Sequence, residues 1–220
     1  MKMPTRVLAV LAPLALAASW CNAAALSVTV LDRDGKPVAD VAVVATAEGG
    51  SSPGAVSADA PTTAIMDQID RQFVPGILTV AKGTTVSFPN SDDTAHQVYS
   101  FSAPKRFELP LYRGQASKPV TFDQPGIVIL GCNIHDSMIG YVYVADSHHH
   151  GKTDARGRID FADLPPGSYR LTAWHPRFSE ASPELVQQLT VGAADATVEF
   201  RLQRPMKPAT EPAKTKKLRY

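Results

Sequence analysis

The chain has 220 residues and a nearly even charge balance, with 22 Lys and Arg against 21 Asp and Glu and a formal net charge of +1. This balance gives no broad basic field, so the composition argues against a nucleic acid as the partner. The 18 prolines, regular turn signals and few long helical periodicities predict an all-β fold with one large or two small domains.

The first 25 residues have the pattern of a secretory signal peptide. A basic start, Met1 to Arg6, precedes an apolar run from Val7 to Trp20 and an alanine-rich exit that ends near Ala25. The apolar run is shorter than the roughly 20 residues that a transmembrane helix needs, which favours cleavage over an uncleaved anchor. We therefore expect residues 1–25 to be removed, and we expect a periplasmic protein without stable membrane insertion.

Cleavage at this point would change two counts. Losing Lys2 and Arg6 leaves 20 basic against 21 acidic residues, so the mature net charge would be about −1. Losing Cys21 leaves Cys132 without an intramolecular disulfide partner. A lone thiol in an exported protein pairs between chains, reacts, or is held by a metal ion.

Residues 26–47 alternate apolar and polar positions on both sides of an Asp34-Gly35 turn, which predicts a strand, a turn and a strand. Two strands are marginally stable alone, so we expect strands within 151–203 to complete their core. Two segments resemble a carboxypeptidase-regulatory-like, transthyretin-related β-sandwich: VTVLDRDGKPVADVAV and GKTDARGRIDFADLPPGSYRLTAWHP. The resemblance implies one discontinuous domain, 26–47 plus 151–203, and says almost nothing about activity.

The rest of the chain divides into a linker, a second globular block and a tail. Gly, Ser, Pro and Ala dominate the start of residues 48–65, which predicts a linker. Residues 66–146 contain strand patterns, among them Ile77–Val80 and Thr84–Phe88, and predict a second β domain. Residues 204–220 carry six basic groups and one acidic group, which predicts a disordered tail that either aids solubility or docks on an acidic partner.

A short loop in the central block, GCNIHDSMIG at 131–140, brings a thiol, an imidazole and a thioether together between two strand patterns. In the predicted β-hairpin, Cys132 ends one strand, His135 lies in the turn, and Met138 begins the next strand. His96 precedes another strand pattern and can reach the same end of a barrel or sandwich. These four side chains are the candidate metal ligands.

The set of donors discriminates between ions. Zinc accepts thiolate and imidazole but has little use for a thioether, and calcium and magnesium prefer oxygen. Covalent haem attachment of the C-x-x-C-H kind needs a second cysteine. Copper is served by two histidines and a cysteine with a long, weak bond to methionine, so we predict one copper ion per chain. Another metal, a metal-free fold, and a Met138 that only fills the core stay open as alternatives.

Residues 66–146 resemble the cupredoxins, the small blue copper proteins, from FVPGILTVAKGTTVSFPNSDDTAH through GCNIHDSMIGYVYVAD. The C-x-x-H-x-x-M spacing is similar to that of amicyanin-like members. The resemblance implies a Greek-key β-sandwich with His96, Cys132 and His135 as strong ligands of a type 1 copper and Met138 as the axial ligand. The whole chain is most similar to cupredoxin-type proteins associated with methylamine utilisation.

Two positions depart from the pattern of this family. Gln97 stands where many members have an Asn that braces the ligand loops, and Asn133 stands where Ser or Thr often follows the cysteine. Both positions bear on the reduction potential and the rigidity of the site more than on the choice of metal. Asn90 and Ser91 are the candidates for a replacement brace.

Four further histidines fall outside this ligand set. His148, His149 and His150 follow the last strand of the block, where they form either an accessory copper site or a solvated loop between domains. His175, within AWHPRF, is predicted to be structural. The sequence gives no indication of the oligomeric state.

These patterns predict an electron carrier without enzymatic activity, which moves single electrons between a dehydrogenase and an oxidase or cytochrome. Ile134 and Ile139 predict an apolar rim around His135, where a redox partner would dock briefly over a small interface. The alternative is a periplasmic copper storage or delivery protein. A third hypothesis is an enzyme with Cys132 as nucleophile and His135 or His96 as base. A fourth, compatible with the electron carrier, is an outer sandwich that serves as a binding module and positions the copper domain on a partner.

Overall fold

The computed structural model describes residues 24–49, 62–115 and 118–209, which contain strands, turns and bends and no helix. The predicted all-β fold is confirmed over these ranges. No helix that is long and apolar enough to cross a membrane occurs among them. Most of the expected signal peptide, residues 50–61 of the expected linker and residues 210–220 of the expected tail lie outside the described residues.

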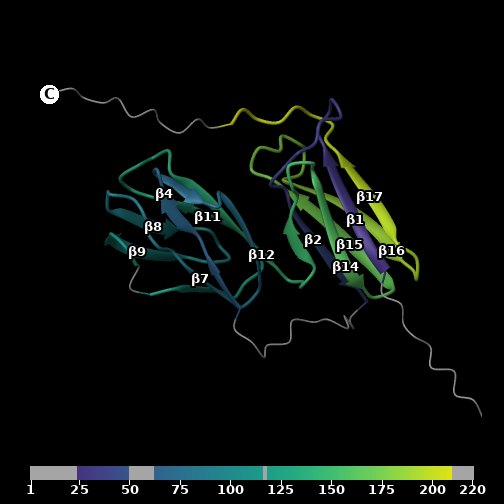
Figure 1. The fold of residues 1–220 in the computed structure, drawn as a ribbon, viewed down its shortest axis with the longest axis horizontal. Helices are drawn as coiled ribbons and strands as arrows, with labels where there is room; N and C mark the ends of the chain where they lie inside the picture. Colours follow the sequence, from purple (N-terminus) through teal and green to yellow (C-terminus); the bar gives the residue numbers. More distant parts are fainter. Residues whose placement is uncertain (1–23, 50–61, 116–117, 210–220) are drawn as a thin grey trace, which may run out of the picture.

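The first of two β-sandwiches combines strands from both ends of the described chain (Figure 1). One sheet has the order β14-β1-β17 and the other has the order β13-β2-β15-β16. The strands are β1 (Ala24–Leu31), β2 (Ala42–Glu48), β13 (His150–Lys152), β14 (Arg158–Leu164), β15 (Gly167–Trp174), β16 (Glu184–Val191) and β17 (Ala196–Arg201). Because side chains alternate along a strand, every second residue of β1, including Leu26, Val28 and Val30, is buried between the sheets.

The two strands on either side of the predicted turn at Gly35 do not pair with each other. β1 pairs with β14 and β17, whereas β2 pairs with β13 and β15. The connecting chain bends through left-handed conformations at Gly35 (φ 81°) and Asp40 (φ 58°) on its way to the opposite sheet. β2 therefore has two buried faces, with Val43 in the core of this sandwich and Val44 against the second one.

The second sandwich is formed by the strands between β2 and β13. Its larger sheet has the order β6-β12-β11-β8-β9 and faces the smaller sheet β10-β7-β3, with the hairpin β4-β5 at one end. The strands are β3 (Thr63–Ile65), β4 (Asp67–Ile69), β5 (Gln72–Val74), β6 (Ile77–Ala81), β7 (Thr84–Ser87), β8 (His96–Ser100), β9 (Phe107–Tyr112), β10 (Val120–Phe122), β11 (Gly126–Gly131) and β12 (Ile139–Ala145). β3 occupies residues that the sequence placed at the end of a linker, and it pairs in parallel with β7.

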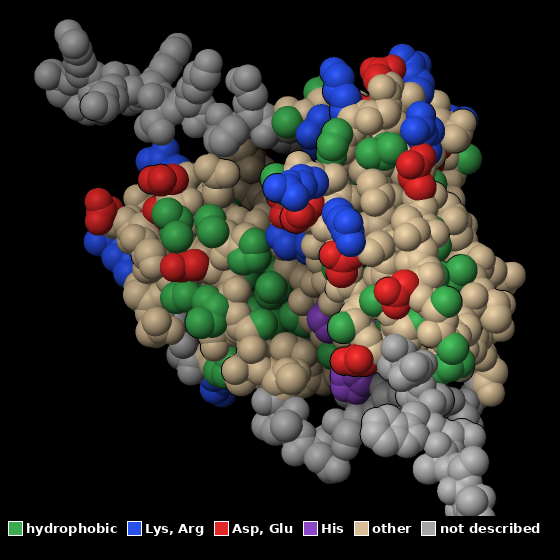
Figure 2. All heavy atoms as spheres, turned by 45° about the vertical axis from the view of Figure 1, so that its right-hand side comes forward, with side chains coloured by type: hydrophobic (Ala, Val, Ile, Leu, Met, Phe, Trp, Pro, Cys, Tyr) green, Lys and Arg blue, Asp and Glu red, His purple; other side chains and the backbone are tan. Residues whose placement is uncertain are grey.

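The two sandwiches share a third apolar cluster. Trp174 of β15 packs against Tyr141 and Tyr143 of β12, with ring centroids 5.4 and 6.0 Å apart. At the edge of the cluster the Tyr143 hydroxyl donates a hydrogen bond to Glu184 at 2.7 Å. Figure 1 shows β12 and β2 side by side, and Figure 2 shows acidic and basic side chains interspersed on one face of the molecule. The second sandwich is thus packed on the first through buried aromatic rings.

The chain beyond β17 begins in contact with the first sandwich. Met206 packs against its core. The Lys207 amide donates to the Arg177 carbonyl at 2.8 Å, and the Arg177 side chain donates to the Lys207 carbonyl at 2.7 Å. Any disordered tail therefore starts later than residue 204, because these contacts fix the first residues assigned to it.

Candidate metal centre

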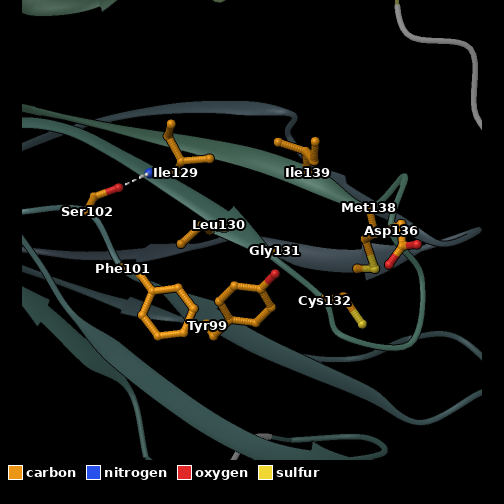
Figure 3. Close-up of a pocket in the computed structure, with 10 residues that line it drawn as sticks. All are labelled: Tyr99, Phe101, Ser102, Ile129, Leu130, Gly131, Cys132, Asp136, Met138 and Ile139. Atoms are coloured by element: carbon orange, nitrogen blue, oxygen red, sulfur yellow. Dashed lines mark hydrogen bonds between the residues drawn. The ribbon is translucent and has the colours of Figure 1, made fainter.

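The β11–β12 hairpin positions the cysteine and the methionine. Gly131 at the end of β11 pairs with Ile139 at the start of β12, so the loop between them closes the hairpin. Within that loop the His135 amide donates to the Cys132 carbonyl, and the Met138 amide donates to the His135 carbonyl at 2.8 Å. These turns bury Cys132 (3% exposed) and Met138 (1% exposed) in the core of the second sandwich. Figure 3 shows both sulfur atoms at the loop end of the hairpin.

His96 reaches the same place from the neighbouring strand. It is the first residue of β8, which pairs with β11, and its side chain is fully buried. Its Nδ1 lies 3.9 Å from the Cys132 sulfur and 3.2 Å from Nδ1 of His135. The ligand atoms of these three residues all lie within 4.8 Å of one another. Three of the four predicted ligands therefore converge, and Met138 lies in the same core cluster as Cys132.

The spacing of these atoms suits a metal ion. Metal–imidazole bonds are about 2 Å long, so two nitrogens bound to one ion stand roughly 3–3.5 Å apart. The 3.2 Å between the two Nδ1 atoms falls in this range. A thiolate with two imidazoles, and a thioether at hand, is the donor set of a type 1 copper site, and the cluster is consistent with one.

Asp92 fixes the orientation of His96. One carboxylate oxygen of Asp92 lies 2.6 Å from Nε2 of His96, on the side of the ring opposite the cysteine. A carboxylate only accepts hydrogen bonds, so the proton of a neutral His96 belongs on Nε2. Nδ1 is then the free lone pair that faces the sulfur and His135. The sequence analysis did not single out Asp92, although it directly follows Asn90 and Ser91, the two residues considered as a brace.

The carboxylate of Asp92 is held in turn by the β4–β5 turn. The backbone amides of Asp70 and Arg71 donate to its two oxygens at 2.5 and 2.9 Å. Both residues adopt left-handed conformations (φ 51° and 58°), and successive backbone amides of such a turn form a concavity for anions. Partial burial alone would raise the pKa of Asp92, but the hydrogen bonds from Arg71, His96 and Asp70 outweigh it and lower that pKa.

Asn90 braces the loop that carries Asp92. Its side-chain amide donates to the carbonyls of Thr94 and Tyr112 at 3.0 and 2.9 Å, and its side-chain oxygen accepts from the Asp92 amide. Asn90 is buried, and its backbone also exchanges two hydrogen bonds with Gly114. Of the two brace candidates, Asn90 is therefore the one that ties the loop before His96 to β9. Ser91 is exposed and donates to Asp67.

The two departures from the family pattern contact each other. Asn133, in the ligand loop, donates to the side-chain oxygen of Gln97 at 2.7 Å. Gln97 also donates to Glu108 of β9. Gln97 thus links the loop of Cys132 to two strands of the large sheet, in place of the short Asn that the resemblance led us to expect.

His135 is the most accessible of the three clustered ligands. It is half-buried, and Ile134 beside it is 50% exposed. Burial, and then the neighbouring His96 and Arg71, lower the pKa of His135 despite the opposing effect of Asp92. An uncharged imidazole at the surface end of the cluster is the form that binds a metal ion.

A groove of about 420 Å³ runs along the outer face of β8, β11 and β12 to the two sulfur residues (Figure 3). The ring of Tyr99 lies over the backbone of Gly131, where an added Cβ would fall 2.7 Å from the ring. Phe101, which is 72% exposed, packs on Tyr99 with ring centroids 5.1 Å apart. Together with Ile139, these side chains extend the apolar surface beside the cluster.

Within the described ranges, His148, His149 and His150 belong to no group of three or more converging metal-binding side chains. His150, in β13, pairs with Val44 of β2. The ring centroid of His149 lies 6.4 Å from that of Phe161. His149 lies in a bend, and His150 is the first residue of β13. Nδ1 of His150 is buried without a hydrogen-bond partner, and burial lowers the pKa of both residues.

His175 is held within the first sandwich. Its Nδ1 accepts a hydrogen bond from the Arg177 amide at 3.1 Å, and its ring lies 5.8 Å from that of Phe178. Burial, followed by the charge of Arg177, lowers its pKa to about 4, against a smaller raising effect of Asp40. These contacts agree with a structural role.

No protein-family model and no curated protein matches the chain. Among solved structures, the reduced Cu(I) form of a proline-to-glycine variant of amicyanin is 26% identical over 46% of this chain and 98% of amicyanin, with a TM-score of 0.35. A purple cupredoxin from Nitrosopumilus maritimus is 22% identical over 38% of this chain and 99% of its own, with a TM-score of 0.33.

A Cu-containing nitrite reductase from Thermus scotoductus SA-01 is 25% identical over 44% of this chain, with a TM-score of 0.35. The match spans only 27% of the length of that enzyme. At TM-scores of this size the likenesses do not establish a family, so the chemistry of the site is inferred from the residues of this chain.

Proposed function

We propose that this chain is a type 1 copper protein that carries single electrons between redox partner proteins in the periplasm. His96, Cys132 and His135 would be the strong ligands of one copper ion, and Met138 the weak fourth ligand. The observation that carries the proposal is the convergence of a buried thiol and two imidazole nitrogens within 4.8 Å. Copper, when bound, would supply a couple between the +1 and +2 states at this donor set.

The residues of the chain contribute rigidity to this function. Cys132 and Met138 are buried in the core of the second sandwich, and His96 is held at Nε2 by Asp92. Ligands that are held by packing and hydrogen bonds change position little when the charge at the site changes. The same burial excludes water from the sulfur atoms.

The surface next to His135 is the proposed point of electron exchange. His135 is half-buried, and the exposed apolar side chains of Ile134, Ile139 and Phe101 lie on the surface around the same loop. Weak redox encounters use small interfaces, for which such an apolar surface is suited. From the sequence resemblance we propose a dehydrogenase of methylamine utilisation as the donor and a cytochrome as the acceptor, with no substrate turned over by this chain.

The test is to add Cu(II) to the purified protein and to record its visible absorption and electron paramagnetic resonance spectra. We expect an intense blue colour and one copper ion per chain, because a Cu(II)–thiolate bond in this geometry defines a blue copper site. Cys132→Ser should lose the colour. Ser137→Ala, in the exposed part of the same loop, should keep it.

Two outcomes would overturn the proposal. The first is a wild-type protein that binds Cu(II) without colour, with Cys132 still open to alkylation. The second is a coloured protein that releases Cu(I) to a weak chelator on reduction, because a carrier retains its metal in both states. That second result would support the storage or delivery alternative.

A further inference from the structure

We propose that Asp92 is a positioning residue that orients His96 and lowers the reduction potential of the copper site. This inference rests on the proposed function, since a potential exists only with copper bound. It concerns the side of His96 that faces away from the metal. His96, Cys132, His135 and Met138 are the ligands themselves, and Asp92 acts only through the first of them.

The contact between Asp92 and His96 joins a buried ring to a partly buried carboxylate. The side chain of His96 is fully buried and that of Asp92 is 12% exposed. At 2.6 Å, the separation of Nε2 from the carboxylate oxygen is that of a strong, charge-assisted hydrogen bond. Water competes weakly for a contact with so little exposure, so the orientation of the ring follows the carboxylate.

Two parts of the chain keep the carboxylate in place. The amides of Asp70 and Arg71, in the β4–β5 turn, occupy its two oxygens from one side. The side chain of Asn90 accepts a hydrogen bond from the Asp92 amide and so fixes the backbone below it. A carboxylate that is fixed by its neighbours can impose its own position on the ring of His96.

The negative charge of Asp92 shifts the reduction potential of the copper couple in a defined direction. A negative charge close to the site stabilises the more positively charged Cu(II) state relative to Cu(I). Hydrogen bonding of a ligand ring to a carboxylate also makes the other nitrogen a stronger donor, which favours Cu(II) again. Both effects lower the potential.

The first experiment compares Asp92→Asn with Asp93→Asn. Asp93 is the exposed neighbour in the same loop, so its substitution removes an equal charge without touching His96. We expect Asp92→Asn to weaken Cu(II) binding by about 10- to 100-fold, as is usual for the partner of a metal-bound histidine. If Cu(II) loses tenfold more affinity than Cu(I), the potential rises by about 59 mV. Asp93→Asn should change the Cu(II) affinity less than about threefold.

The second experiment needs no copper. Nitrogen-15 NMR of the metal-free protein reports which ring nitrogen of His96 carries the proton. We expect Nε2 in the wild type, and a mixture of both tautomers in Asp92→Ala, which removes the acceptor. Asp92→Asn retains an oxygen that can accept from Nε2, so it keeps a hydrogen bond that Asp92→Ala loses. If Asp92→Ala does not fold, the reduction potential of Asp92→Asn decides alone.

The outcomes separate this inference from the proposed function. A blue wild type in which Asp92→Asn and Asp93→Asn have the same potential and Cu(II) affinity would overturn the role of Asp92 and leave the copper site standing. A wild-type His96 with its proton on Nδ1 would overturn it as well. A colourless wild type with the expected tautomer would instead contradict the proposed function and support the positioning of the ring by Asp92.

Discussion

The two sandwiches of this chain bury apolar cores of the same kind but differ in the polar groups beside them. Among the described residues, the first sandwich buries only two polar side chains, Thr153 and Thr172. The second buries a larger polar set: Gln68, Thr84, Asn90, His96 and Ser100. The comparison separates a region with an almost wholly apolar core from a region whose core includes the polar groups of a candidate site.

The polar groups of the second sandwich form a connected support at one end of it. Gln68 donates to Tyr112, which donates to the Phe88 carbonyl, and Asn90 donates to the Tyr112 carbonyl. Burial is the main cause that raises the pKa of Tyr112 to about 12, which keeps it a neutral donor. The side-chain oxygen of Gln68 is buried without a partner, which costs about 1–3 kcal/mol. Because the two sandwiches also share a buried apolar cluster, we infer that the second depends on packing against the first for part of its stability.

The largest predicted effect comes from breaking that packing. Trp174→Ala should reduce the free energy of unfolding by about 3–5 kcal/mol, because it empties the aromatic cluster with Tyr141 and Tyr143. Calorimetry should then resolve two transitions instead of one, with the less stable one belonging to the second sandwich. Val186→Ala, at an exposed site of the adjacent strand β16, is the matched control and should stay within about 0.5 kcal/mol. A single transition at the wild-type temperature in Trp174→Ala would contradict a contribution of this cluster to stability.

The next prediction compares one buried brace from each sandwich. Asn90→Ala leaves two carbonyls and one amide without partners, and Thr153→Ala removes the hydroxyl that donates to Val38 and accepts from Val41. Each should cost about 2 kcal/mol in chemical denaturation of the metal-free protein. Only Asn90→Ala should also speed the release of copper, because only Asn90 supports the loop of Asp92. Equal copper release rates in the two variants would contradict the division between the two regions.

A smaller loss of stability is expected in the first sandwich when the pH is lowered. The pKa of His175 is about 4 in the folded protein, below the ordinary value of 6.5. Between these values the unfolded chain binds a proton that the folded chain does not, so stability falls as the pH decreases from about 6.5 toward about 4. Because His175 is only partly buried, we expect a loss of about 1 kcal/mol at pH 5. His175→Gln, whose side-chain oxygen can accept from the Arg177 amide, should lose correspondingly less stability between pH 7 and pH 5. The remaining pH dependence of stability, measured by denaturant titration, should persist in His175→Gln because His149 and His150 also titrate.

Much of the fold followed from residue patterns that act locally. Strand patterns located β6 and β7, and glycine located the turn at Gly35. The sequence did not reveal that β1 and β2 enter opposite sheets, because the conformation of the connecting residues depends on the rest of the fold. One signal was present: residues 41–45, Val-Ala-Val-Val-Ala, lack polar alternation, and such a run is typical of a strand buried on both faces.

The candidate site, like the fold, could be predicted from the sequence only in part. The spacing from Cys132 to Met138 and the predicted hairpin placed three donors at one end, since a hairpin fixes which residues its loop presents. Asp92 could not be identified from spacing, because its contact with His96 depends on a loop shaped by Asn90 and by the distant β4–β5 turn. The contact between Gln97 and Asn133 is similar. Each residue was read as a departure from a pattern, and only the pairing of β8 with β11 brings them together.

The smallest predicted effect tests whether these two departures compensate each other. Gln97→Ala and Asn133→Ala each remove one side of the 2.7 Å hydrogen bond between β8 and the ligand loop. A double-mutant cycle in the metal-free protein should give a coupling energy of about 0.5 kcal/mol, the lower end for a hydrogen bond open to solvent. Gln97 also contacts Glu108, but that contribution cancels in the cycle because it is lost in both backgrounds. With copper bound, the two single variants should shift the potential in the same direction, and the double variant by less than their sum. Fully additive stabilities and potentials would mean that the two residues are independent, and the brace of the second sandwich would then rest on Asn90 alone.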